Sequence, residues 1–151
     1  MPINPLQSDR APIDDVWTPT QVHMLDALVG ACALVAHADG WVTPEERKRV
    51  LERMRALPAL QVFGVAEASV CFEALEDRFD RNPEAARAEA RKAVRRLRGQ
   101  GEAARLVVSS ACAVADADGG FDGEERQVLL RICHLLALDP SQFVLVHRGA
   151  A

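Results

Sequence analysis

The 151-residue sequence has few aromatic residues and no hydrophobic run long enough to cross a membrane. Phe, Trp and Tyr together make up 5% of the residues, a low share for a β protein, in which aromatic side chains are enriched. The longest apolar stretch, at 27–36, falls well short of the roughly 20 residues that a bilayer span needs. The proline-containing N-terminus also lacks the apolar core of a secretory signal. We therefore predict a cytoplasmic protein that does not itself span a membrane.

The sequence also lacks closely spaced cysteines and a strong charge of one sign. No C-x-x-C motif links its four cysteines, which are Cys32, Cys71, Cys112 and Cys133. Each has apolar neighbours, so we predict free thiols that pack as small hydrophobic side chains in a reducing compartment. A formal net charge of −4 gives no general attraction to nucleic acid. With 49% hydrophobic residues, the chain is suited to one globular core.

Signals for the start and end of helices recur along the chain. Thr18 to Gln21 and Thr43 to Glu46 both fit capping boxes with proline at the first helical position. Gly40 and Gly99 are expected to end helices. Further helix starts are expected at 82–83, 122–125 and 139–142, and apolar residues recur at spacings of three and four, which is typical of helices.

These patterns predict an all-α protein, a single-domain bundle of about seven helices. The first helix is expected to bury one face, with Val22, Leu25 and Val29 on it, and the fourth is expected to run from Pro83 to Arg98. We place a proline-containing N-terminal tail at 1–16, the helical domain at 17–147 and a short C-terminal tail at 148–151.

Two segments of the sequence match each other. Residues 29–57 align with 108–136 without a gap, so that Asp39-Gly40 meets Asp118-Gly119 and Glu45-Glu46 meets Glu124-Glu125. This match predicts an internal repeat, in which two helix–acidic turn–helix hairpins are related by a pseudo-twofold axis.

The acidic turns of the repeat are candidate metal sites. Their aspartates and glutamates partly follow the spacing of an EF-hand loop, but Val35 and Val114 stand where the first ligand belongs, so neither turn is an EF-hand. All-oxygen ligands favour Ca²⁺ or Mg²⁺. The candidate metal ligands are Asp39, Glu46, Asp116, Asp118, Asp122 and Glu125.

Helix capping is the alternative explanation of these turns. An Asp-Gly pair is a common helix end, and a capping box alone explains the spacing from Thr43 to Glu46. Capping does not explain why Asp116, Asp118 and Asp122 crowd one turn, where like charges repel. Two hypotheses therefore remain open: a divalent-metal-binding module, with the second turn favoured, and a metal-free interaction scaffold.

Several separated motifs resemble a known family. Residues 38–46, with Ala38-Asp39-Gly40 followed by Thr43-Pro44-Glu45-Glu46, and residues 118–125 resemble the tellurite-resistance protein TerB family. Residues 132–143 are similar to the end of that domain, and the resemblance covers about 17–146.

The resemblance implies a non-enzymatic bacterial protein of tellurite resistance and the stress response. It further implies a divalent cation held by acidic residues, and protein partners that include a membrane-associated tellurium-resistance component. Through such a partner, the protein would lie at the inner face of the membrane. The motif carries over the acidic positions Asp39, Glu46, Asp118, Asp122 and Glu125.

A basic stripe and one tryptophan are candidate partner surfaces. The stripe consists of Arg87, Arg91, Arg95 and Arg98 at helical spacing. It is either a solvated helix face, which we slightly favour, or a docking surface for an acidic partner or anionic lipid headgroups. Trp41 either covers the helix junction or anchors a partner. No aromatic residues alternate with the arginines, so nucleic acid is not expected, and no nucleophile–base pattern indicates an enzyme.

Overall fold

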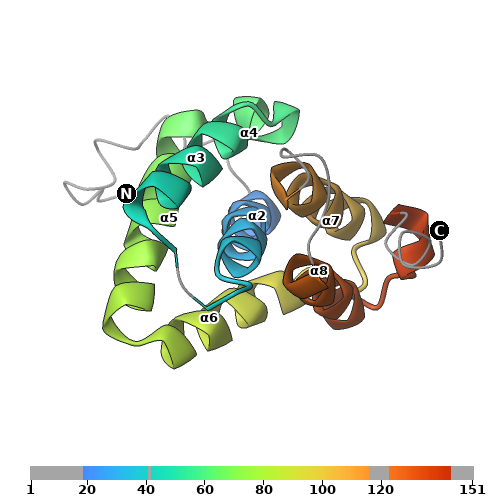
Figure 1. Ribbon diagram of the computed structural model, residues 1–151. Helices are drawn as coiled ribbons and strands as arrows, with labels where there is room; N and C mark the ends of the chain where they lie inside the picture. Colours follow the sequence, from blue (N-terminus) through green and yellow to red (C-terminus); the bar gives the residue numbers. More distant parts are fainter. Residues whose placement is uncertain (1–18, 41, 116–122, 144–151) are drawn as a thin grey trace.

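The computed structural model describes residues 19–40, 42–115 and 123–143, and these residues form seven α-helices and one 3₁₀ helix (Figure 1). Within these ranges no strand occurs, so the all-α prediction is confirmed. The helices are α2 (Pro19–Ala36), α3 (Pro44–Arg55), α4 (Pro58–Phe63), α5 (Val65–Arg81), α6 (Pro83–Arg95), α7 (Gly101–Ala115), α8 (Gly123–Leu136) and η2 (Pro140–Phe143). The predicted tails at 1–16 and 148–151 lie outside the described residues, and the domain bounds 17–147 stay a prediction.

Helix α2 lies at the centre of the molecule, with the longer helices arranged around it (Figure 1). Every residue from 27 to 35 is buried, so this helix has no solvent-facing side over that stretch. The prediction that it buries a single face is wrong, since Val22 is 41% exposed while Leu28 and Leu34 are buried. A helix that is apolar all round belongs in the interior of a bundle, and its neighbours cover it here on all sides.

Small residues let α2 and α6 approach closely. Gly30 and Ala90 are buried where the two helices meet. A Cβ atom added at Gly30 would lie 3.2 Å from the carbonyl oxygen of Ala90, which is tighter than ordinary van der Waals contact. The position of α6, which carries two arginines of the site described below, therefore depends on glycine at position 30.

Two helix boundaries differ from the sequence prediction. Helix α4 was not predicted, because its six residues are too few to show a helical period. It begins with Pro58 at its first helical position, a residue that needs no N–H donor there. Helix α6 ends at Arg95 rather than Arg98, and a turn leads to Gly99 at a φ of 90°.

The two helix pairs that the repeat predicts, α2–α3 and α7–α8, are both present in the described residues. Helix α7 packs against both α2 and α8, and α3 also contacts α7, so the two pairs share one core. The pseudo-twofold relation between the pairs stays a prediction.

None of the four cysteines forms a disulfide, as the sequence predicts. Burial raises the pKa of Cys32 to about 12 and those of Cys71 and Cys133 to about 11. These three thiols therefore stay protonated near neutral pH, where a reactive cysteine would need a thiolate. Among the described helices, none has both the length and the apolar character that a membrane crossing requires.

Candidate functional site

The first acidic turn connects α2 to α3 and begins with a left-handed glycine. Gly40 has a φ of 91°, a conformation that glycine adopts at no steric cost, and it ends α2 as predicted. Helix α3 then starts with the predicted capping box: the Glu46 N–H donates to Thr43 Oγ1 over 3.0 Å, and the Thr43 N–H donates to Glu46 Oε1 over 2.9 Å. The hydrogen bonds from Thr43 lower the pKa of Glu46. Glu46 is therefore a capping residue, and its role as a metal ligand stays a prediction.

Buried charges hold this turn from the inside. The Glu76 carboxylate on α5 is 1% exposed and lies 2.7 Å from His37 Nε2 through one oxygen and 2.7 Å from Arg47 Nε through the other. Arg47, at the start of α3, also donates two hydrogen bonds to Asp80, of 3.0 and 3.3 Å. We call His37, Arg47, Glu76 and Asp80 the buried network. It links the end of α2 and the start of α3 to α5.

Further contacts fix the members of the buried network. The two hydrogen bonds between Arg47 and Asp80 raise the pKa of the arginine and lower that of the aspartate. The His37 ring stacks on Phe79, with a centroid distance of 3.8 Å and an interplanar angle of 4°. The guanidinium of Arg87 lies over the same Phe79 ring, 5.9 Å from its centroid. The His37 ring is thus held through its Nε2 atom by Glu76 and through one ring face by Phe79. These contacts anchor the chain where the first acidic turn begins.

Glu76 is a member of the buried network that was not predicted from the sequence. This residue lies on the same face of α5 as Phe72 and Phe79, which the apolar period does place in the core. A glutamate four residues after one core phenylalanine and three before the next is itself on the core face. Such a buried acid requires a partner, so the position could have been recognised from spacing alone.

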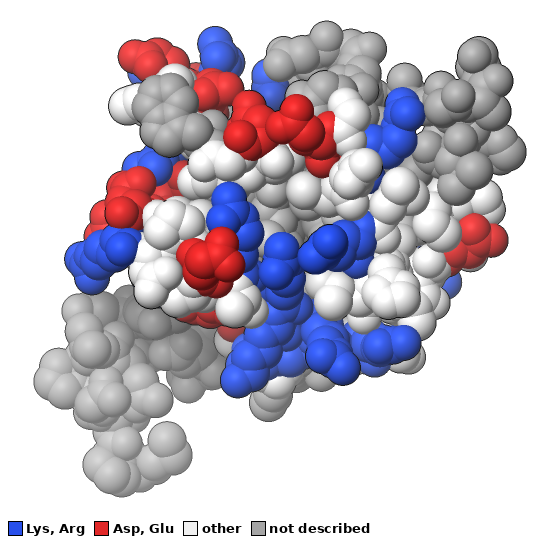
Figure 2. Space-filling model, turned by 60° about the horizontal axis from the view of Figure 1, so that its bottom comes forward, with Lys and Arg blue, Asp and Glu red and all other residues white. Residues whose placement is uncertain are grey.

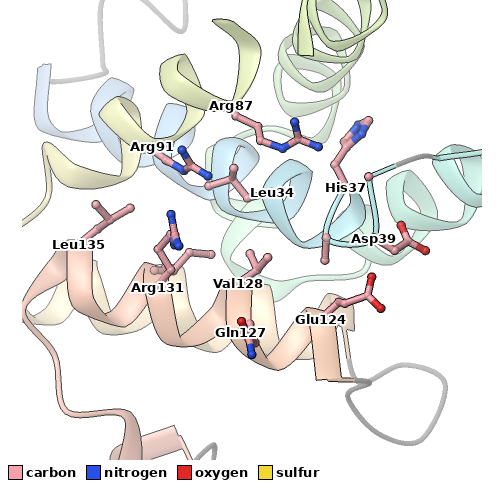
Figure 3. Close-up of a pocket in the computed structure, with 13 residues that line it drawn as sticks. Leu34, His37, Asp39, Arg87, Arg91, Glu124, Gln127, Val128, Arg131 and Leu135 are labelled. Atoms are coloured by element: carbon pink, nitrogen blue, oxygen red, sulfur yellow. The ribbon is translucent and has the colours of Figure 1, made fainter. Parts of the chain in front are cut away.

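A pocket of about 490 Å³ opens beside the first turn, between α2, α6 and α8. Its apolar wall includes Leu34, Val128 and Leu135 (Figure 3). Asp39 and Glu124 lie at one end of the view in Figure 3, whereas Arg91 and Arg131 extend into the pocket from α6 and α8 toward the other end. Its charged lining residues are Asp39, Glu124, Arg87, Arg91 and Arg131.

The pocket brings together some of the residues singled out by the sequence. Asp39, Arg87 and Arg91 line it, whereas Glu46 does not, and Arg95 and Arg98 are exposed outside it. Glu125 lies in the first turn of α8 and is engaged in an interaction there. The candidates that fall outside the described residues are Trp41, Asp116, Asp118 and Asp122.

Two lining residues, Glu124 and Arg131, were missed. The repeat contains a signal for Glu124, because it aligns with Glu45 and directly follows the second acidic turn. Arg131 gave no signal, because only packing brings the middle of α8 next to α6.

The carboxylates of the described residues do not complete a metal site by themselves. Over 19–40, 42–115 and 123–143, no three His, Cys, Asp or Glu side chains come together as metal ligands. Asp39 and Glu124 supply oxygen donors to one pocket, and oxygen is the donor that Ca²⁺ and Mg²⁺ prefer. Their chemistry fits such an ion, but Ca²⁺ takes about six to eight oxygens, so further protein or water ligands would be needed.

Comparison with known proteins agrees with the helical fold and the acidic motifs. The model of the family described as "Tellurite resistance protein TerB" matches residues 25–148. A "Tellurium resistance protein TerB" from Alcaligenes sp is 32% identical over 84 residues, which cover 56% of this chain and 69% of that protein. No solved structure matches. The family match spans most of the chain, and the chain therefore belongs to the TerB family of tellurite-resistance proteins.

Proposed function

We propose that this chain is a non-enzymatic tellurite-resistance protein that binds a divalent cation beside Asp39 and Glu124, and that it acts through protein partners. One observation carries the proposal. Asp39 belongs to the first turn, Glu124 directly follows the second, and both line the same pocket. The two turns are far apart in the sequence, so a common pocket favours one shared cation site over two separate half-sites.

The repeat adds ligands of the right kind to this proposal. Asp116, Asp118 and Asp122 precede Glu124 by only a few residues in the sequence. Carboxylates gathered in one place repel one another unless a cation neutralises them. An ion bound by Asp39 and by carboxylates of the second turn would therefore offset a repulsion that the acidic turns create.

Thermal unfolding with and without metal ions tests the cation site. We expect Ca²⁺, Mg²⁺ or Mn²⁺ to raise the Tm relative to EDTA, because an ion that binds only the folded state stabilises it by about 2.7 kcal/mol at 100 times its Kd. Asp118→Asn and Glu124→Gln should each reduce the rise in Tm.

Glu45→Gln is the matched control for Glu124→Gln. Glu45 occupies the aligned position of the first repeat, is exposed and does not line the pocket, so this variant should keep the full metal response. If no ion raises the Tm of the wild-type protein, the cation site is wrong. If Glu45→Gln loses as much response as Glu124→Gln, the ions act through general surface charge.

A metal-free interaction scaffold is the second candidate, and the capping box favours it. Thr43 and Glu46 satisfy each other's backbone N–H groups without any ion. In that case the acidic turns only cap helices, and the charged faces dock partners. This candidate predicts equal Tm values in EDTA and in each metal ion, together with normal tellurite tolerance for the Asp118→Asn variant.

The role in resistance is tested separately in cells. Expression of this chain in a bacterial host that has lost its own TerB protein should restore growth on tellurite. Restored growth together with an unresponsive Tm would favour the scaffold. A metal-responsive Tm and growth that fails only for Glu124→Gln would favour the metal-binding module.

A further inference from the structure

Three arginines converge on the pocket from two helices. Arg87 and Arg91 come from α6, and Arg131 comes from the middle of α8. Figure 2 shows Lys and Arg gathered in a band on this side of the molecule, apart from a group of Asp and Glu. The chain as a whole carries a net charge of −4, so this concentration of positive charge is local.

Two of the three pocket arginines lack an ion-pair partner among the described residues. In the described part of the chain, Arg91 and Arg131 form no ion pair or hydrogen bond with a protein group. Arg87 has two partners: Glu84, at 3.5 Å with a side chain 92% exposed, and the Phe79 ring described above. Like charges held near one another repel, so this arrangement lowers stability unless a ligand compensates it. Some arginines elsewhere in the described residues pair with acids, as Arg47 and Arg78 do, whereas Arg95 and Arg98 do not; what sets Arg91 and Arg131 apart is that they line a pocket.

The walls of the pocket limit what the ligand can be. Its apolar wall is aliphatic, and His37, the one lining residue with a ring among the described residues, already stacks on Phe79. Gln127 also lines the pocket, as an uncharged polar residue of α8. A volume of about 490 Å³ is within the usual range for small-molecule sites.

The charge of the arginines further defines the ligand. Since Arg87 already pairs with Glu84, a single carboxylate would still leave Arg91 or Arg131 uncompensated, whereas linked phosphate groups carry several charges and many acceptor oxygens. The guanidinium fork matches the geometry of phosphate, to which it donates two parallel hydrogen bonds. An adjoining hollow shares Arg91 and Arg131 and continues along α8 to His134, which gives room for a second anionic group.

We propose that Arg87, Arg91 and Arg131 form a binding site for a small soluble ligand with two or more phosphate groups. The ligand spans the space between α6 and α8 and neutralises Arg91 and Arg131, which have no acidic partner among the described residues. This site goes beyond the proposed cation site and does not depend on it, because the arginines bind the ligand without a metal ion. The measurements below are made in EDTA, so they test the phosphate site even if no cation site exists.

Isothermal titration of the full chain with inorganic pyrophosphate tests the proposal. Wild type should bind saturably, with one ligand per chain. The double variant R91Q/R131Q should bind about 100-fold more weakly, since each lost charge-assisted contact costs about tenfold or more. R91K/R131K keeps the charge but loses the fork, and its affinity should lie between the two.

R95Q/R98Q is the matched control. It removes the same charge from exposed arginines that do not line the pocket, so its affinity should stay within about twofold of wild type. Equal losses in R91Q/R131Q and R95Q/R98Q would overturn the proposal, because binding would then reflect general charge. Two further titrations test other anionic ligands: malonate represents a soluble dicarboxylate, and vesicles of phosphatidylglycerol represent an anionic lipid surface. Malonate that binds as tightly as pyrophosphate, or binding to vesicles alone, would overturn the assignment to a soluble phosphate ligand.

Discussion

Two groups of charged side chains lie close together in this protein, and they differ in how their charges are satisfied. In the buried network, Glu76 contacts both His37 and Arg47, and Arg47 also binds Asp80. In the neighbouring pocket, Arg91 and Arg131 have no acidic partner among the described residues. Charges paired inside the fold hold it in place, whereas unpaired charges around a hollow lower stability and are available to a ligand.

The two groups are connected through one aromatic ring. Phe79 stacks on His37 of the buried network, and Arg87 of the pocket lies over the same ring. His37 also lines the pocket, two residues before Asp39. The buried network therefore adjoins the pocket at His37 and supports the pocket wall there. Substitutions in the first group should mainly change stability, and substitutions in the second should mainly change binding.

Glu76→Gln gives the largest expected effect. It leaves the Arg47 charge without its buried partner, and removing one member of a buried ion pair typically costs about 3–5 kcal/mol. Since Arg47 keeps Asp80, we expect a loss near the lower end, about 3 kcal/mol in the free energy of unfolding. Urea denaturation followed by circular dichroism measures it.

Glu73→Gln is the control for that measurement. Glu73 lies on the same helix and is exposed, so its replacement should change the free energy of unfolding by less than about 0.5 kcal/mol. A loss below about 1 kcal/mol in Glu76→Gln would show that the buried carboxylate contributes little, and the contrast between the two charged groups would then disappear.

The fold could be read from the sequence because its signals are local. Capping at Thr43, the stop at Gly40 and the apolar periods all depend on neighbouring residues, and the structure confirms them. The central position of α2 could not be read in this way. Its apolar residues show which side chains avoid water, but the number of helices that cover them depends on how the remaining chain packs.

The candidate site was only partly predictable for a similar reason. Asp39, Arg87 and Arg91 were singled out by sequence patterns, and the structure places them around one pocket. Arg131 completes the positive side from a different helix, and no short-range pattern links α8 to α6. Glu76 is the opposite case. Its spacing from the core phenylalanines of α5 places it on the buried face, so its burial was predictable, although glutamate is usually a surface residue.

The pH dependence of stability offers a smaller test, at the exposed edge of the buried network. Arg47 lowers the pKa of Asp80 below its usual value of 3.8, so this carboxylate stabilises the folded state above that pH. The contribution is lost as pH falls through the folded-state pKa. Asp80→Asn should therefore lower the free energy of unfolding at pH 6, and the difference from wild type should shrink toward pH 3.

Because the Asp80 side chain is 57% exposed, we expect this difference in the free energy of unfolding to be less than about 1 kcal/mol at pH 6. Asp77→Asn on the same helix is the control, and an equal pH dependence in both variants would contradict the role of Arg47.

The smallest expected effect is on the stability of R91Q/R131Q, which tests the pocket arginines as Glu76→Gln tests the buried network. Removing two charges that have no acidic partner should leave the free energy of unfolding within about 0.5 kcal/mol of wild type in EDTA. At low salt we expect a slight gain, because repulsion among the pocket arginines is relieved and salt no longer screens it. Urea denaturation at low and at high salt measures both values. A loss of more than about 1 kcal/mol would mean that these arginines hold α6 against α8, as Glu76 holds the first turn, and that the pocket is part of the structural framework.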